Sequence, residues 1–217
     1  MALRLYLLRN AETHYCRTGR YCSRDGVPLT AHGQEMANFF AQTYQKINWK
    51  ALFCSPLSHA VETLRPLTQA TGLSFESRQG LRELSFGKWE GMAPEEVNQE
   101  FHDDYIRWLA DPAWNSPTLG ENAMQVARRT SNVLAEIEES HPDGDVLIVA
   151  HKATLRNMLC TLLGVDVGRY RDRLAMPVTA LSLVELLDYG PFVRRFNDCN
   201  HLPLYLRRPW AGNGSDS

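Results

Sequence analysis

Residues 145–150 read Asp-Val-Leu-Ile-Val-Ala (DVLIVA) and form the most strand-like run of the chain. A helical pattern over residues 153–163 follows at once and ends before Gly164. The same order, a strand and then a helix, occurs twice nearer the N-terminus. Repeated units of this kind predict a mostly parallel sheet with helices on both faces, a three-layer α/β/α fold.

The other expected elements follow from apolar periodicity and from turn residues. The expected strands cover residues 3–8, 51–54 and 73–77, and the expected helices cover residues 30–47, 57–70, 93–110 and 122–140. Residues 180–187 and 192–196, joined by Asp-Tyr-Gly-Pro, indicate a closing antiparallel hairpin. We expect one domain over residues 1–208 and a flexible tail over 209–217.

Composition excludes several classes of protein. The 217 residues are 44% hydrophobic and 22% charged, which is ordinary for a globular chain. With 23 basic and 25 acidic side chains the net charge is -2, so neither nucleic acid nor an anionic membrane is an expected partner. The five cysteines lack metal-ligand spacing and no signal peptide is evident, which favours reduced thiols and a cytoplasmic location.

Ligands of open α/β sheets bind beyond the carboxyl ends of the strands. Arg9 ends the first expected strand, and His151 follows the strand at 145–150. An arginine fork, helix N-terminal amides and a protonated histidine all suit a phosphate dianion. The strand ends therefore predict a phosphate site.

Five ordered segments resemble the motifs of the histidine phosphatase (phosphoglycerate mutase-like) superfamily. They are LYLLRNAETHYCRTGRYC (5–22), CSPLSHAVETL (54–64), LRELSFGKWEGM (81–92), LGENAMQVARR (119–129) and VAHKATLR (149–156). The resemblance implies a phosphoglycerate mutase-like fold with a helical lid at about 93–120. It also implies a metal-independent phosphomonoester hydrolase, without a cofactor, that acts on a small phosphorylated metabolite. Weaker similarity points to phosphoserine and sugar-phosphate phosphatases.

The resemblance also implies roles for individual positions. In the family a histidine attacks phosphorus, a glutamate protonates the leaving oxygen, and two arginines and a second histidine bind the phosphoryl group. Arg9, Glu83 and His151 match the first arginine, the acid and the second histidine. The nucleophile position is Asn10, and the second phosphate-binding arginine is replaced by His59.

These departures put the activity in doubt. The amide nitrogen of Asn10 is delocalised into its carbonyl and cannot attack phosphorus as imidazole does. His59 lacks the permanent charge and the fork of arginine, and Leu119 replaces a family glycine, so the pocket looks remodelled. The chain would then be an inactive or impaired phosphatase.

Several alternatives stay open. Asn10 could be a deliberate change that traps substrate, or the natural state of a phosphometabolite-binding or regulatory pseudoenzyme. His59 or His151 could serve as a substitute nucleophile. Mutase activity and a homodimer are further options.

Two other features have structural and functional interpretations. Arg169, Arg171 and Arg173 form a basic strip that either contacts an anion or lies on the surface. Trp89, Trp108 and Trp114 lie in the segments that form the lid in the family that this chain resembles, so they either shape the substrate cleft or pack in the core.

Overall fold

The computed structural model describes residues 2–207 and contains one six-stranded sheet with the strand order β3-β2-β4-β1-β5-β6. Its strands are β1 (Leu3–Arg9), β2 (Trp49–Cys54), β3 (Glu76–Ser77), β4 (Gly144–Ala150), β5 (Leu181–Leu187) and β6 (Gly190–Asp198). Strands β1 to β4 run parallel, whereas β5 pairs antiparallel with β1 and β6. The predicted mixed sheet with its closing hairpin is confirmed.

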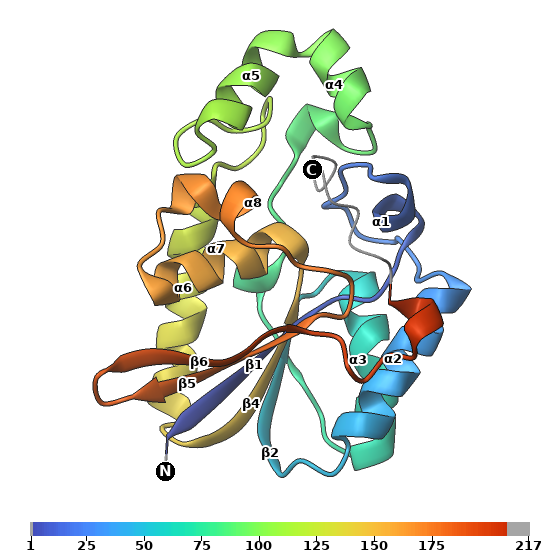
Figure 1. Ribbon diagram of the computed structural model, residues 1–217, viewed down its shortest axis with the longest axis vertical. Helices are drawn as coiled ribbons and strands as arrows, with labels where there is room; N and C mark the ends of the chain where they lie inside the picture. Colours follow the sequence, from blue (N-terminus) through green and yellow to red (C-terminus); the bar gives the residue numbers. More distant parts are fainter. Residues whose placement is uncertain (1, 208–217) are drawn as a thin grey trace.

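Helices cover both faces of this sheet. The α-helices of the described residues are α1 (His14–Thr18), α2 (Ala31–Tyr44), α3 (Ser58–Thr71), α4 (Pro94–Glu100), α5 (His102–Ala110), α6 (Ala123–Ser140), α7 (Lys152–Leu163) and α8 (Tyr170–Arg173). Short 3₁₀ helices are η1 (Gln79–Leu81), η2 (Gly87–Trp89), η3 (Val167–Arg169) and η4 (Leu204–Leu206). Figure 1 shows α2 and α3 on one side of the sheet and α6 and α7 on the other, which gives the expected three layers.

The central strand β4 shows why its sequence is apolar without alternation. Val146 and Ile148 pack in the core beneath α6 and α7, and Leu147 and Val149 pack in the core beneath α2 and α3. All four side chains are fully buried. A strand covered on both faces needs apolar residues at every position.

Helices α4 and α5 lie at the top of the view in Figure 1, beyond the end of the sheet where β1 and β4 finish. Val97 of α4 and Trp108 of α5 share a buried cluster with Ala153 of α7 and Tyr170 of α8. This packing ties the two helices to the segment that follows β4. No helix within residues 2–207 is long and apolar enough to cross a membrane.

Local structure departs from the expected elements in three places. The single helix expected over 93–110 is broken at Phe101, whose φ of -127° and ψ of 40° separate α4 from α5. The strand expected over 73–77 is reduced to the two residues of β3. Helices α1 and α8 were not predicted, because five and four residues are too few to show a helical period. The tail expected over 209–217 lies outside the described residues.

Candidate functional site

The parallel pairing of β1 and β4 brings Asn10 and His151 together. Arg9 is the register partner of Ala150, and the Asn10 N–H donates to the Ala150 carbonyl at 2.9 Å. The next residue of each strand therefore leaves the sheet at the same edge. Asn10 Oδ1 lies 3.2 Å from Nδ1 of His151.

His59 reaches the same point from α3. Its Nε2 lies 3.1 Å from His151 Nδ1, and the two ring centroids are 4.8 Å apart at an interplanar angle of 67°. One helical turn further on, Thr63 donates to the His59 carbonyl and accepts from the Ala11 N–H. The start of α3 is thereby joined to the loop after β1, so His59 and Asn10 keep a fixed spacing.

The hydrogen bonds determine which nitrogen of His151 carries its proton. Asn10 Nδ2 donates to the Ala11 carbonyl at 2.9 Å, which turns Oδ1 toward His151. Because Oδ1 can only accept, the proton of His151 is on Nδ1. His151 Nε2 then accepts from the Ser55 hydroxyl at 2.7 Å. His59 Nε2 likewise accepts from His151 Nδ1.

Burial keeps both imidazoles uncharged. His59 is 4% exposed and His151 is 2% exposed. Loss of solvation lowers the pKa of His59 to about 4 and holds the pKa of His151 well below its usual value, helped there by the nearby His59 and Arg129. At neutral pH these positions present dipoles to a ligand rather than the positive charge that arginine would supply.

Arg9 contributes the permanent charge beside this pair. Its guanidinium donates to the Met176 carbonyl, and Nη2 lies 3.8 Å from the Sγ of Cys16. Thr13 donates to the same sulfur at 3.3 Å and caps the N-terminus of α1. The short helix α1 thus forms one wall of the site next to Arg9.

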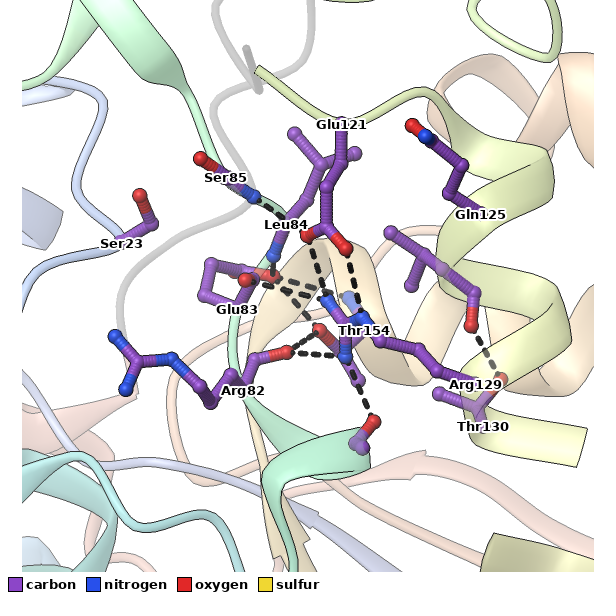
Figure 2. A network of polar contacts seen from close by, with 12 residues as sticks. Ser23, Arg82, Glu83, Leu84, Ser85, Glu121, Gln125, Arg129, Thr130 and Thr154 are labelled. Atoms are coloured by element: carbon purple, nitrogen blue, oxygen red, sulfur yellow. Dashed lines mark hydrogen bonds and ion pairs between the residues drawn. The ribbon is translucent and has the colours of Figure 1, made fainter. Parts of the chain in front are cut away.

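Glu83 is fixed at the first turn of α7. Its Oε1 accepts from the backbone N–H groups of Leu84 and Thr154 and from the Thr154 hydroxyl, and Oε2 accepts from the Ala153 N–H. These contacts are at 2.9 to 3.2 Å, and Figure 2 shows those from Leu84 and Thr154. The carboxyl group of Glu83 therefore has a defined orientation, held by backbone N–H groups two and three residues after His151.

A second network supports the segment that carries Glu83. Arg129 of α6 donates to the carbonyls of Gly80, Arg82 and Glu83 and forms an ion pair with Glu121 at 3.1 Å (Figure 2). Glu121 also accepts from the Ser85 N–H. The acidic residue of the LGEN segment is thus structural.

All five predicted site residues line one cavity of about 630 Å³, namely Arg9, Asn10, His59, Glu83 and His151. Arg171, from the basic strip for which an anion contact was one interpretation, lines it too, but sequence reasoning missed most of the other polar and aromatic lining residues: Tyr15, Cys16, Arg17, Arg20, Tyr21, Lys152 and Arg156. Several stand inside the quoted motifs, but nothing in the motifs themselves showed which way their side chains point. Trp108 is 1% exposed and lines the cavity, and Trp89 is fully buried in the core. Trp114 is 72% exposed and is not among the lining residues, so neither interpretation holds for it.

The expectation that Leu119 remodels the pocket is wrong. Its side chain is 81% exposed and does not line the cavity. The residue instead has a φ of 60°, the left-handed conformation in which glycine is the unstrained choice. Leucine at this position therefore alters backbone strain, whereas His59 alters the pocket.

Residues 2–207 contain no group of three or more His, Cys, Asp or Glu side chains placed to hold a metal ion.

Two curated relatives that the chain resembles carry phosphatase names. The chain is 29% identical over 168 residues to phosphoserine phosphatase 1 of Hydrogenobacter thermophilus, covering 77% of this chain and 80% of the relative. It is 28% identical over 162 residues to the adenosylcobalamin/alpha-ribazole phosphatase of Escherichia coli, covering 75% and 80%.

Solved structures and a family model agree with these relatives. A crystal structure of a putative alpha-ribazole-5'-P phosphatase from Escherichia coli superposes with a TM-score of 0.84 at 25% identity, over 92% of this chain and 98% of that one. The model of the histidine phosphatase superfamily (branch 1) matches residues 5–199. With its fold, its ordered motifs and nearly its whole length matched, the chain belongs to the histidine phosphatase superfamily.

Proposed function

We propose that this chain is a metal-independent phosphomonoester hydrolase of the histidine phosphatase type, directed at a small phosphorylated metabolite and inactive or impaired because of Asn10. The observation that carries the proposal is the position of Asn10. Its amide lies at the junction of two strand ends, in one cavity with Arg9, Glu83 and His151, and is hydrogen-bonded to His151. The relatives that carry phosphatase names support the class of reaction.

The proposed chemistry assigns each group a step. In a chain with histidine at position 10, an imidazole nitrogen would attack phosphorus, the bond to the leaving oxygen would break, and Glu83 would give that oxygen a proton. Water would then attack phosphorus and give a proton to the Glu83 carboxylate, and the phosphorus–nitrogen bond would break to release phosphate and the free imidazole. Arg9, His59 and His151 would hold the phosphoryl oxygens, and residues 93–120 would serve as a lid within a single domain.

A second function is favoured by a different observation. His59 and His151 are both buried and neutral, so the phosphate site has fewer cations than the family pattern implies. This arrangement suits a non-catalytic phosphometabolite-binding or regulatory protein on the same scaffold. A cytoplasmic location and a homodimer stay predictions in either case.

The experiment is to compare hydrolysis by the unaltered chain, Asn10→His and Asn10→Ala. In Asn10→His, the imidazole Nδ1–H can replace Nδ2 as the donor to the Ala11 carbonyl. That hydrogen bond fixes the tautomer and leaves the Nε2 lone pair available for attack. Asn10→Ala opens the same space without a nucleophile and is the matched control.

We expect turnover of p-nitrophenyl phosphate and of a panel of phosphometabolites by Asn10→His alone. Labelled substrate should also leave an acid-labile phosphoprotein in that variant. All three proteins must give the same circular dichroism spectrum and bind inorganic phosphate. A folded, phosphate-binding Asn10→His protein without turnover would contradict the impaired-enzyme proposal and favour the binding protein.

A further inference from the structure

The basic strip after α7 divides into two surface arginines and one that lines the cavity. Arg169 and Arg173 both pair with the carboxylate of Asp172. Arg171, between them, lines the cavity and places its guanidinium carbon 3.7 Å from the ring centroid of Trp108. The strip is therefore not one surface feature.

Trp108 gives Arg171 a rigid base. The indole is 1% exposed and contacts the rings of Trp89 and Tyr21 edge-on, with centroids 5.3 and 5.8 Å apart. Stacking uses the face of the guanidinium and leaves the N–H groups at its edge able to donate. Within residues 2–207 no carboxylate forms an ion pair with Arg171, and the indole Nε1 of Trp108 has no hydrogen-bond partner.

The charge of the cavity exceeds what one phosphoryl group needs. Seven lysines and arginines line it, whereas Glu83 is the one carboxylate among its described lining residues. Arg9 lies beside Asn10 at the strand ends, while Arg171 belongs to α8 and stacks on the lid helix α5. The positive charge therefore extends from the phosphate site to the lid.

We propose that Arg171, held flat on Trp108, binds a carboxylate group carried by the substrate in addition to its phosphate. The inference rests on the proposed function, since it assumes that the phosphoryl group binds at Arg9. A planar fork of N–H donors matches a carboxylate in two parallel hydrogen bonds. The preferred substrate class is then a small phosphorylated hydroxy acid rather than the phosphate ester of a neutral alcohol.

Calorimetric binding to the unaltered chain tests this without requiring turnover. 3-Phosphoglycerate and glycerol 3-phosphate form a matched pair, because they differ only in a carboxylate against a hydroxymethyl group. A charged hydrogen bond predicts that 3-phosphoglycerate binds about tenfold more tightly or better. Arg171→Gln should bring the ratio of the two affinities, 3-phosphoglycerate over glycerol 3-phosphate, close to one. It should leave the affinity for glycerol 3-phosphate nearly unchanged.

The control is Arg173→Gln, which removes the same charge two residues away from a side chain that is 57% exposed. It should keep the ratio. Arg171→Lys retains the positive charge but lacks the planar pair of N–H donors, so it should keep only part of the affinity ratio. This variant tests the proposal even if Arg171→Gln folds poorly. A full ratio in Arg171→Gln, or an equal loss for both ligands, would overturn the assignment of Arg171. Failure of both ligands and of inorganic phosphate to bind the unaltered chain would instead refute the phosphate site itself, and this inference with it.

Discussion

His201 makes a quantitative prediction about stability in acid. It follows β6 and is 7% exposed, with its ring edge-on to Phe40 and Tyr44 of α2 at centroid distances of 5.5 and 5.8 Å. Neither ring nitrogen has a hydrogen-bond partner within the described residues. Burial lowers the pKa of His201 to about 4, while Asp198 and Arg207 act in opposite directions on it.

The sign follows from proton binding in the two states. The pKa of a histidine is near 6.5 in the unfolded chain and about 4 here in the folded one. Between these values the unfolded state binds a proton that the folded state does not, so the free energy of unfolding falls as the pH falls. The full loss corresponds to about 3 kcal/mol, of which about 2 kcal/mol is lost between pH 7 and pH 5.

His201→Phe should remove this contribution. Phenylalanine keeps an aromatic ring against α2 and has no nitrogen to protonate or to leave unpaired. Urea unfolding at pH 7 and pH 5 gives the free energy of unfolding at each pH. We expect the acid-induced loss to be smaller in His201→Phe than in the unaltered chain by about 2 kcal/mol.

His59 and His151 are also buried and neutral, and their protonation in the unfolded state lowers the free energy of unfolding as well. This contribution is the same in the unaltered chain and in His201→Phe, so it cancels when the two acid-induced losses are compared. The control is His32→Phe, which changes an exposed histidine on the same helix α2. It should leave the acid-induced loss as it is in the unaltered chain. An unchanged loss in His201→Phe would refute the reasoning, because the folded state would then accommodate the protonated ring.

Two further predictions concern the backbone and the phosphate site. Leu119→Gly should raise the free energy of unfolding by about 1 kcal/mol, measured by urea titration. The reason is that an 81% exposed leucine at a φ of 60° contributes backbone strain and little burial. A lower free energy of unfolding in Leu119→Gly would contradict this account. Sulfate, which stays a dianion between pH 6 and pH 8, should bind with net uptake of protons and more tightly at pH 6 than at pH 8, because a dianion raises the low pKa of His59 toward the working pH. Calorimetry in two buffers of different ionisation enthalpy measures that uptake, and binding without it would show that both rings stay neutral beside the ligand.

The sequence predicted the sheet well, because its signals are local. The run at β4 is apolar on both faces and is followed by a helix, which defines a buried parallel strand without knowledge of its neighbours. The motifs also located Arg9, Glu83 and His151, which lie next to strand ends or at the start of a helix.

Contacts between distant segments could not be predicted in the same way. Arg171 and Arg173 look equivalent in the sequence, and only the position of Trp108, more than sixty residues earlier, separates their roles. Leu119 was wrongly placed in the pocket because a departure from a motif does not reveal whether the side chain or the backbone is affected. Its positive φ identifies the backbone.

Asn10 and His59 are coupled through His151, and this coupling bears on whether a histidine could replace the missing nucleophile. His151 Nδ1–H is shared between Asn10 Oδ1 and His59 Nε2, and the remaining lone pair of His151, on Nε2, accepts from Ser55. The lone pair of each ring is therefore engaged, and attack by either one would first require these buried hydrogen bonds to break. A permanently charged arginine at position 59 would be costly to bury without an anion, whereas the neutral His59 contacts His151 at 3.1 Å. The two departures therefore form one hydrogen-bonded unit, and it is the return of an imidazole at position 10, rather than a shift of role to His59 or His151, that should restore attack on phosphorus.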